Sequence, residues 1–129
     1  MIIKNYILIL AIGIFANIAG PQTILASSQR YQVEGTKDEI TKEVKRVFGA
    51  GANTALAVLN CESGFNVAAV SRTKDYGLFQ INSRTWTRLF GEEFKVNWKE
   101  NIRVAKVIYD RSGSWNPWAS SRKCWGKNG

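Results

Sequence analysis

This chain of 129 residues contains no histidine, so proton chemistry falls to its ten acidic side chains, to lysine or to tyrosine. Glu62 differs from the other acids because it ends an apolar run at residues 55–61 (ALAVLNC). The carbonyl end of a helix disfavours a carboxylate, and apolar surroundings raise its pKa further. A carboxyl group that stays protonated near neutral pH can act as a general acid. The alternative is an ordinary glutamate before a Ser-Gly turn.

A second carboxylate and two amides follow within one short stretch. Asp75 lies in the turn-forming sequence KDYG at residues 74–77. Gln80 and Asn82 alternate around one apolar residue, so their amides project to one side, where they suit hydrogen bonding to a neutral polar ligand. The structural alternatives are an aspartate that only forms a turn and an amide pair that braces a hairpin.

All five tryptophans lie in the second half of the chain. Trp98 falls on the apolar stripe of a predicted helix, so we expect it in the core. Trp86 and Trp118 are better candidates for a cleft, where their flat apolar faces could lie against sugar rings. Filling the core of a small domain is the alternative for both.

Composition excludes several function classes. The chain is 45% hydrophobic and 22% charged, as expected for one folded domain. Lacking histidine, it cannot form Ser-His or Cys-His nucleophile pairs or His-ligated zinc sites, and its two cysteines cannot form a four-thiolate site. We therefore expect no metal and no cofactor. The net charge is +8, but the basic residues are scattered without an aromatic-plus-basic stripe, so no nucleic-acid partner is expected.

Residues 1–26 have the pattern of a secretory signal peptide. Lys4 precedes an apolar run at residues 7–20, and a small residue, Ala26, precedes a polar flank. The run is short for a membrane span, which needs about 20 apolar residues. We expect cleavage after Ala26 and export to a secreted, periplasmic or cell-wall location. A retained membrane anchor and a buried helix are the alternatives, and only the anchor would bring membrane contact.

Export also bears on Cys61 and Cys124. Two cysteines normally pair in an oxidising compartment, and this pair would close nearly the whole mature domain into one loop. Two unpaired, buried thiols are the alternative.

The sequence predicts a short linker at residues 27–35 and then a predominantly helical α+β domain. Thr36 and Glu39 form a capping box that begins the first helix, and glycines at 49 and 51 end it. The other predicted elements are a helix over residues 55–62 capped by Asn53 or Thr54, a small β-hairpin or irregular loop within 65–82, a helix over 83–90 capped by Ser83, a helix over 97–111, and a last helical turn from Asn116-Pro117.

Four motifs occur together in a recognisable order. They are CESGFN at residues 61–66, DYGLFQINS at 75–83, NIRVAK at 101–106 and WNPWA at 115–119. The chain resembles the lysozyme superfamily, between the c-type lysozymes and the bacterial and phage lytic transglycosylase domains, over residues 36–125. This resemblance implies a lysozyme-like fold for a catalytic domain at residues 36–129, with the small β-hairpin beside a cleft.

The resemblance also implies roles for two carboxylates and four cleft residues. Glu62 would be the general acid, and Asp75 stands where c-type lysozymes keep their second carboxylate. The implied substrate-binding residues are Gln80, Asn82 against an acetamido sugar, Trp86 beside the sugar path, and Trp118 shielding the glutamate.

Three departures separate the chain from its relatives. The segment at residues 63–74 is shorter than in c-type lysozymes, only two cysteines are present, and the Ala-Tyr-Asn-Ala-Gly element of many soluble lytic transglycosylases is missing. The Glu-Ser-Gly form, in contrast, is closer to the bacterial transglycosylases.

The implied activity is cleavage of the β-1,4 bond between N-acetylmuramic acid and N-acetylglucosamine in peptidoglycan, by a monomer whose partners are glycan strands. The intact Asp75-Tyr76-Gly77 run favours hydrolysis. The alternative is lytic transglycosylation, in which Glu62 is the sole acid and base and the product is a 1,6-anhydro sugar. A non-catalytic module that binds cell-wall glycan is the alternative of another class.

Overall fold

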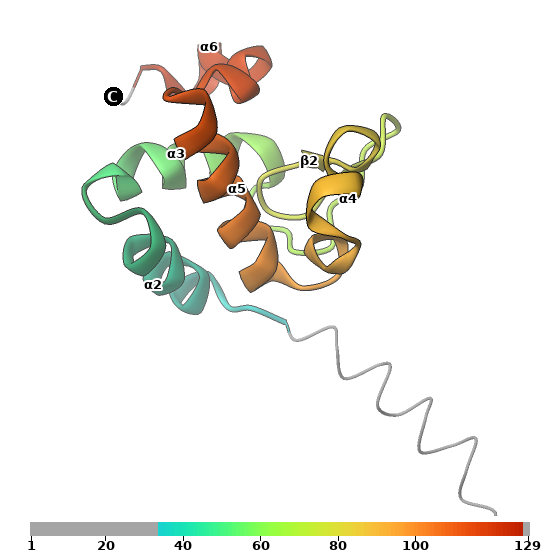
Figure 1. Ribbon diagram of the computed structural model, residues 1–129. Helices are drawn as coiled ribbons and strands as arrows, with labels where there is room; N and C mark the ends of the chain where they lie inside the picture. The colour runs from blue at the N-terminus through green and yellow to red at the C-terminus, as the bar shows by residue number, and fades with distance from the viewer. Residues whose placement is uncertain (1–33, 128–129) are drawn as a thin grey trace, which may run out of the picture.

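The structure is a computed structural model, and it describes residues 34–127 (Figure 1). The expected signal peptide at residues 1–26 and linker residues 27–33 lie outside this part. Among the helices of residues 34–127, none combines the length and the apolar character that crossing a membrane requires.

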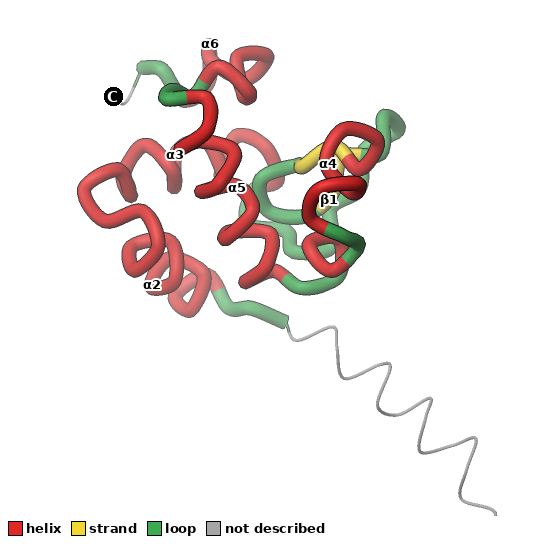
Figure 2. Tube along the Cα trace, in the orientation of Figure 1, coloured by secondary structure: helices red, strands yellow, loops and turns green. Residues whose placement is uncertain are grey.

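Helices make up most of the described chain, and one two-stranded sheet accompanies them, which confirms the predicted α+β class (Figure 2). The helices are α2 (Lys37–Phe48), α3 (Ala52–Ser63), α4 (Ser83–Phe90), α5 (Trp98–Ser112) and α6 (Arg122–Trp125), with 3-10 turns η1 (Gly49–Gly51), η2 (Glu93–Lys95) and η3 (Asn116–Ser121). Strand β1 (Asp75–Tyr76) pairs antiparallel with β2 (Ile81–Asn82), so that Asp75 lies opposite Asn82.

The predicted capping box begins α2. The Glu39 backbone N–H donates to Thr36 Oγ1 at 3.2 Å, and the Thr36 N–H donates to the Glu39 carboxylate at 2.9 Å. These two bonds satisfy backbone donors that a helix start leaves without partners. Ile40, Val44 and Phe48 then fall on one face and are buried in the core.

The predicted start of α3 and the predicted caps of α3 and α4 are wrong. Helix α3 begins at Ala52 without a side-chain cap, rather than after Asn53 or Thr54, because the N–H of Ala52 already bonds to Gly49 in the preceding 3-10 turn. Helix α4 is capped by Asn82 instead of Ser83, since Asn82 Oδ1 accepts the Thr85 N–H at 3.1 Å.

Helix α5 runs through the middle of the domain, with α2 on one side and the hairpin with α4 on the other (Figure 1). Asn97, at which the predicted helix starts, is its N-cap, and Trp98, Ile102 and Ala105 form the expected buried stripe. It ends one residue beyond the predicted position, before Gly113.

Asn101 is the fully buried polar side chain on α5. Its Oδ1 accepts the Phe79 N–H at 2.9 Å, and its Nδ2 donates to the carbonyls of Tyr76 at 2.8 Å and Phe94 at 3.0 Å. Gly77 makes this close approach possible, because a Cβ at that position would lie 2.6 Å from Asn101 Nδ2. A single amide thus fixes the loop between β1 and β2 to the core.

A disulfide joins Cys61, near the end of α3, to Cys124 on α6, which confirms the predicted pairing. The disulfide holds α6 against the end of α3, although the two cysteines are 63 residues apart in the sequence.

Asn101→Leu should lower the free energy of unfolding by about 3 kcal/mol or more. Leucine has the same side-chain branching as asparagine, but it is bulkier and cannot form hydrogen bonds. The Phe79 N–H and the carbonyls of Tyr76 and Phe94 therefore lose this partner, at about 1–3 kcal/mol for each buried group. Chemical denaturation measures the difference. The control is Asn53→Leu, because Asn53 is exposed. A loss below about 1 kcal/mol at Asn101 would contradict its proposed role as an anchor.

Candidate functional site

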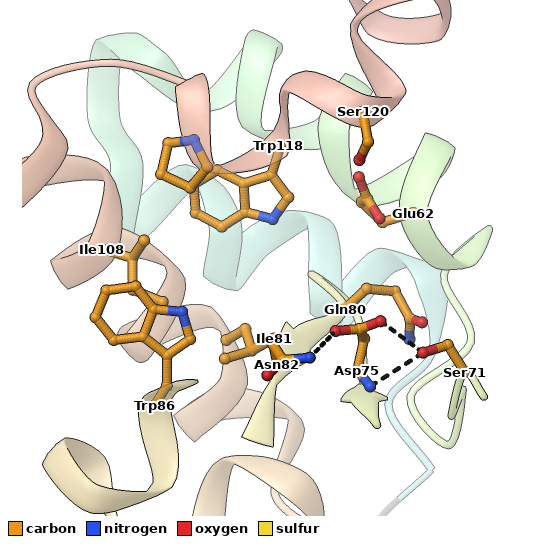
Figure 3. Close-up of a pocket in the computed structure, with 11 residues that line it drawn as sticks. Glu62, Ser71, Asp75, Gln80, Ile81, Asn82, Trp86, Ile108, Trp118 and Ser120 are labelled. Carbon is orange, nitrogen blue, oxygen red and sulfur yellow. Dashed lines mark hydrogen bonds between the residues drawn. The ribbon is translucent and has the colours of Figure 1, made fainter. Parts of the chain in front are cut away.

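A cavity of about 320 Å³ lies between the end of α3, the hairpin, α4 and η3 (Figure 3). All six side chains that the sequence singled out for catalysis or substrate binding line it. They are Glu62, Asp75, Gln80, Asn82, Trp86 and Trp118. The fold therefore brings together residues from four separate elements, as the resemblance implies.

Glu62 lies in the last turn of α3, which ends at Gly64 in the left-handed conformation. Partial burial raises the pKa of Glu62 above its ordinary value, a hydrogen bond from Ser121 opposes that rise, and the negative charge of Asp75 adds to it. Ser121 Oγ donates to Glu62 Oε1 at 2.5 Å. The net effect favours a protonated carboxyl group at the edge of the cavity.

Asp75 has the opposite tendency. Partial burial alone would raise its pKa, but hydrogen bonds from Ser71, Thr73 and Asn82 outweigh that effect and lower it. Ser71 Oγ donates to Oδ2 at 2.6 Å, Thr73 Oγ1 donates to the same oxygen, and Asn82 Nδ2 donates to Oδ1 at 2.7 Å. Asp75 is thus an ionised carboxylate whose two oxygens both accept hydrogen bonds from the chain.

The side-chain amides of Gln80 and Asn82 form hydrogen bonds within the hairpin region, which is the structural role considered for them from the sequence. Gln80 Nε2 donates to the carbonyls of Ala69 at 3.1 Å and Gly77 at 3.0 Å. Asn82 Nδ2 donates to the carbonyl of Thr73 at 3.1 Å, in addition to its bond to Asp75. Contact of either amide with a sugar stays a prediction.

The two candidate cleft tryptophans have different surroundings. Trp118 is only 5% exposed, and its Nε1 donates to the Phe79 carbonyl at 2.8 Å, so one edge of the ring lines the cavity while the rest belongs to the core. Trp86 on α4 is half-buried and packs against Phe90, with ring centroids 5.8 Å apart. Trp98 is buried in the core, as predicted.

Three polar partners of the carboxylates were not foreseen from the sequence: Ser71, Thr73 and Ser121. The first two lie in an irregular turn whose geometry no periodicity reveals. The contact of Ser121 could have been predicted from the disulfide. Ser121 precedes Cys124 by one helical turn, and Cys124 is joined to Cys61, the residue before Glu62.

The pair of carboxyl groups can supply a proton donor beside a fixed negative charge. Such a pair, with its two pKa values pushed apart, suits acid–base chemistry on a glycosidic bond. Within residues 34–127, no three His, Cys, Asp or Glu side chains cluster as metal ligands.

Glu62→Gln should become more stable relative to the wild type as the pH rises. A raised pKa means that the stabilising contribution of Glu62 is complete below the ordinary value of 4.5 and is lost as the pH rises through the folded-state pKa. Glutamine mimics the protonated form at every pH and can accept the Ser121 hydrogen bond. Denaturation between about pH 4 and pH 8 measures the trend, and identical pH dependences in both proteins would contradict it.

Comparison with known proteins identifies the domain. Residues 39–121 match the family described as the transglycosylase SLT domain, and this range includes both carboxylates, the hairpin and Ser121. Comparisons with curated proteins and with solved structures gave no match. The matched domain is a lysozyme-like enzyme that acts on peptidoglycan, and together with the disulfide it indicates a location outside the cytoplasm. The chain therefore belongs to the transglycosylase SLT domain family, within the lysozyme-like superfamily.

Proposed function

We propose that this enzyme cleaves the β-1,4 bond between N-acetylmuramic acid and N-acetylglucosamine by lytic transglycosylation, with Glu62 as the sole acid and base. The observation that carries the proposal is the contrast between the two carboxyl groups. Glu62 has a raised pKa at the edge of the cavity, whereas both oxygens of Asp75 are held by hydrogen bonds. Membership of the SLT family also supports this reaction over the hydrolysis that the sequence favoured.

Glu62 would act twice in each turnover. It first donates its proton to the glycosidic oxygen, and the bond from that oxygen to the muramyl C1 breaks. The resulting Glu62 carboxylate then takes the proton of the muramyl C6 hydroxyl while the C6 oxygen bonds to C1. The products are a 1,6-anhydromuramyl end and a free N-acetylglucosamine hydroxyl, and no water is consumed.

Asp75 would support the positive charge that develops at C1 without bonding to it. Hydrogen bonds from Ser71, Thr73 and Asn82 stabilise its negative charge, and the same bonds make its oxygens poor nucleophiles. A fixed carboxylate stabilises an oxocarbenium-like transition state because it needs no reorganisation during the reaction.

Hydrolysis is the second candidate, because Asp75 lines the same cavity as Glu62 and could direct water or capture C1. In either reaction the glycan would lie along Trp86 and the hairpin, with Gln80 and Asn82 facing the sugars. The net charge of +8, which becomes +7 when Lys4 is removed with residues 1–26, favours approach to an anionic cell wall. A signal peptide at residues 1–26, cleaved after Ala26, would deliver the enzyme there.

Digestion of purified peptidoglycan, followed by mass spectrometry of the products, tests the proposal. Transglycosylation gives muropeptides lighter by one water, and hydrolysis gives reducing ends. Glu62→Gln should lower the rate by at least about 10²–10⁴-fold, because the amide cannot donate the proton. Glu92→Gln is the matched control, since Glu92 is exposed and does not line the cavity. If Glu62→Gln kept a tenth of the activity, Glu62 would be excluded as the acid.

Asp75→Asn separates the two reactions. We expect the rate to fall roughly tenfold to a hundredfold because a stabilising charge is lost, while the product remains the anhydro sugar. The high-pH limb of the rate profile should move to lower pH, because removing the negative charge lowers the pKa of Glu62. Asp38→Asn, on the exposed first turn of α2, is the control. A loss as deep as that of Glu62→Gln, with reducing-end products in the wild type, would assign Asp75 as the nucleophile.

A further inference from the structure

We propose that Ser121 is a positioning residue that fixes which oxygen of Glu62 carries the reacting proton. Ser121 Oγ lies 2.5 Å from Glu62 Oε1, and the Glu62 carboxyl lies at the edge of the cavity, facing Asp75 and Gln80 across it (Figure 3). The inference deepens the proposed function and rests on it, because a sole acid and base has to present the same oxygen to two different proton partners in one turnover.

The surroundings of the Ser121 hydroxyl decide where its proton points. A hydroxyl has one proton to donate and two lone pairs that accept. Trp125 Nε1 lies 3.1 Å from Ser121 Oγ and 3.1 Å from the Trp118 carbonyl, and an indole N–H can only donate. The Trp118 carbonyl, at 3.1 Å, is the alternative acceptor for the Ser121 proton.

The indole resolves that choice in favour of Glu62. The Trp125 N–H donates to both the Trp118 carbonyl and one lone pair of Ser121 Oγ. Because the Trp118 carbonyl already has this donor, the Ser121 hydroxyl donates its proton to Glu62 Oε1, which is also the nearer acceptor. Oε1 is then an acceptor whether Glu62 is ionised or neutral. The acidic proton is left to Oε2, which accepts no hydrogen bond from the described residues and would therefore be the oxygen that meets the substrate.

The backbone around this contact is held covalently. Cys61 directly precedes Glu62, Cys124 lies one helical turn after Ser121, and the two cysteines are joined. Trp125 is 8% exposed, so the donor that orients Ser121 is itself packed in the core. The hydroxyl and the carboxyl group therefore meet between two segments that cannot drift apart.

The charges that face Glu62 are few. Asp75 on β1 raises the pKa of Glu62. Helix α3 carries no other charged side chain and η3 carries none. On α6, Arg122 donates to Asn116 and Lys123 is exposed. Burial and Asp75 both raise the pKa of Glu62, and the Ser121 hydrogen bond lowers it. Loss of the Ser121 donor should therefore raise that pKa further.

The test compares Ser121→Thr with Ser121→Val, because these side chains have the same shape and differ only in the hydroxyl. The first measurement is the titration of the Glu62 carboxyl carbon by NMR, which needs no turnover. We expect the Glu62 pKa to be higher by about one pH unit in the Val variant than in the Thr variant, and the Thr variant to resemble the wild type.

The second measurement is the pH profile of peptidoglycan cleavage. The Val variant should lose roughly tenfold to a hundredfold in kcat with little change in KM, and its high-pH limb should move to higher pH. A packing defect would affect the Thr and Val variants alike, so the difference between them measures the loss of the hydroxyl. If either variant fails to fold, Ser121→Ala, which adds no bulk, is compared with the wild type instead.

The outcomes are distinct for the two proposals. Equal Glu62 titrations in the Thr and Val variants would overturn the role of Ser121. A difference in titration in a protein that yields only reducing-end products would uphold the Ser121 contact and overturn the transglycosylase reaction.

Discussion

The buried amide of Asn101 is the contact on which the hairpin side of the cleft depends. It holds the loop between β1 and β2 through the Tyr76 carbonyl and the Phe79 N–H, and the Phe79 carbonyl in turn accepts the indole N–H of Trp118. From the Trp118 carbonyl the hydrogen bonds continue through the indole N–H of Trp125 and the hydroxyl of Ser121 to Glu62. A displacement of the amide would therefore reach both walls of the cavity, because buried polar groups without partners are costly.

The second constraint is electrostatic. Glu62 and Asp75 share one cavity, yet their pKa values move in opposite directions because burial dominates at the first and hydrogen-bond donors dominate at the second. The negative charge of Asp75 helps to keep Glu62 protonated, so the two groups depend on each other. The same arrangement limits what Asp75 can do, since a carboxylate that already accepts three hydrogen bonds is better suited to stabilising charge than to forming a bond.

Local features of the fold were visible in the sequence, and long-range ones were mostly not. The Thr36–Glu39 capping box depends on two residues three positions apart, so it can be recognised in the sequence alone. The role of Asn82 as a helix cap was hidden because its amide also suited a cleft, and only the fold shows that it serves the hairpin. The Ser121–Glu62 bond joins residues 59 positions apart. Only the predicted disulfide indicated that these two segments lie together, because hydrophobic periodicity gives no information about contacts between distant segments.

The aromatic cluster behind the cavity also has an optical consequence. The ring centroid of Trp115 lies 5.3 Å from that of Trp118 and 6.5 Å from that of Trp125, and Trp118 reaches the cavity. Indoles this close exchange excitation energy efficiently, so light absorbed by any of the three is shared with the ring beside Glu62. A ligand that contacts Trp118 in the cavity should therefore change the emission of all three indoles, so binding can be followed without an attached dye.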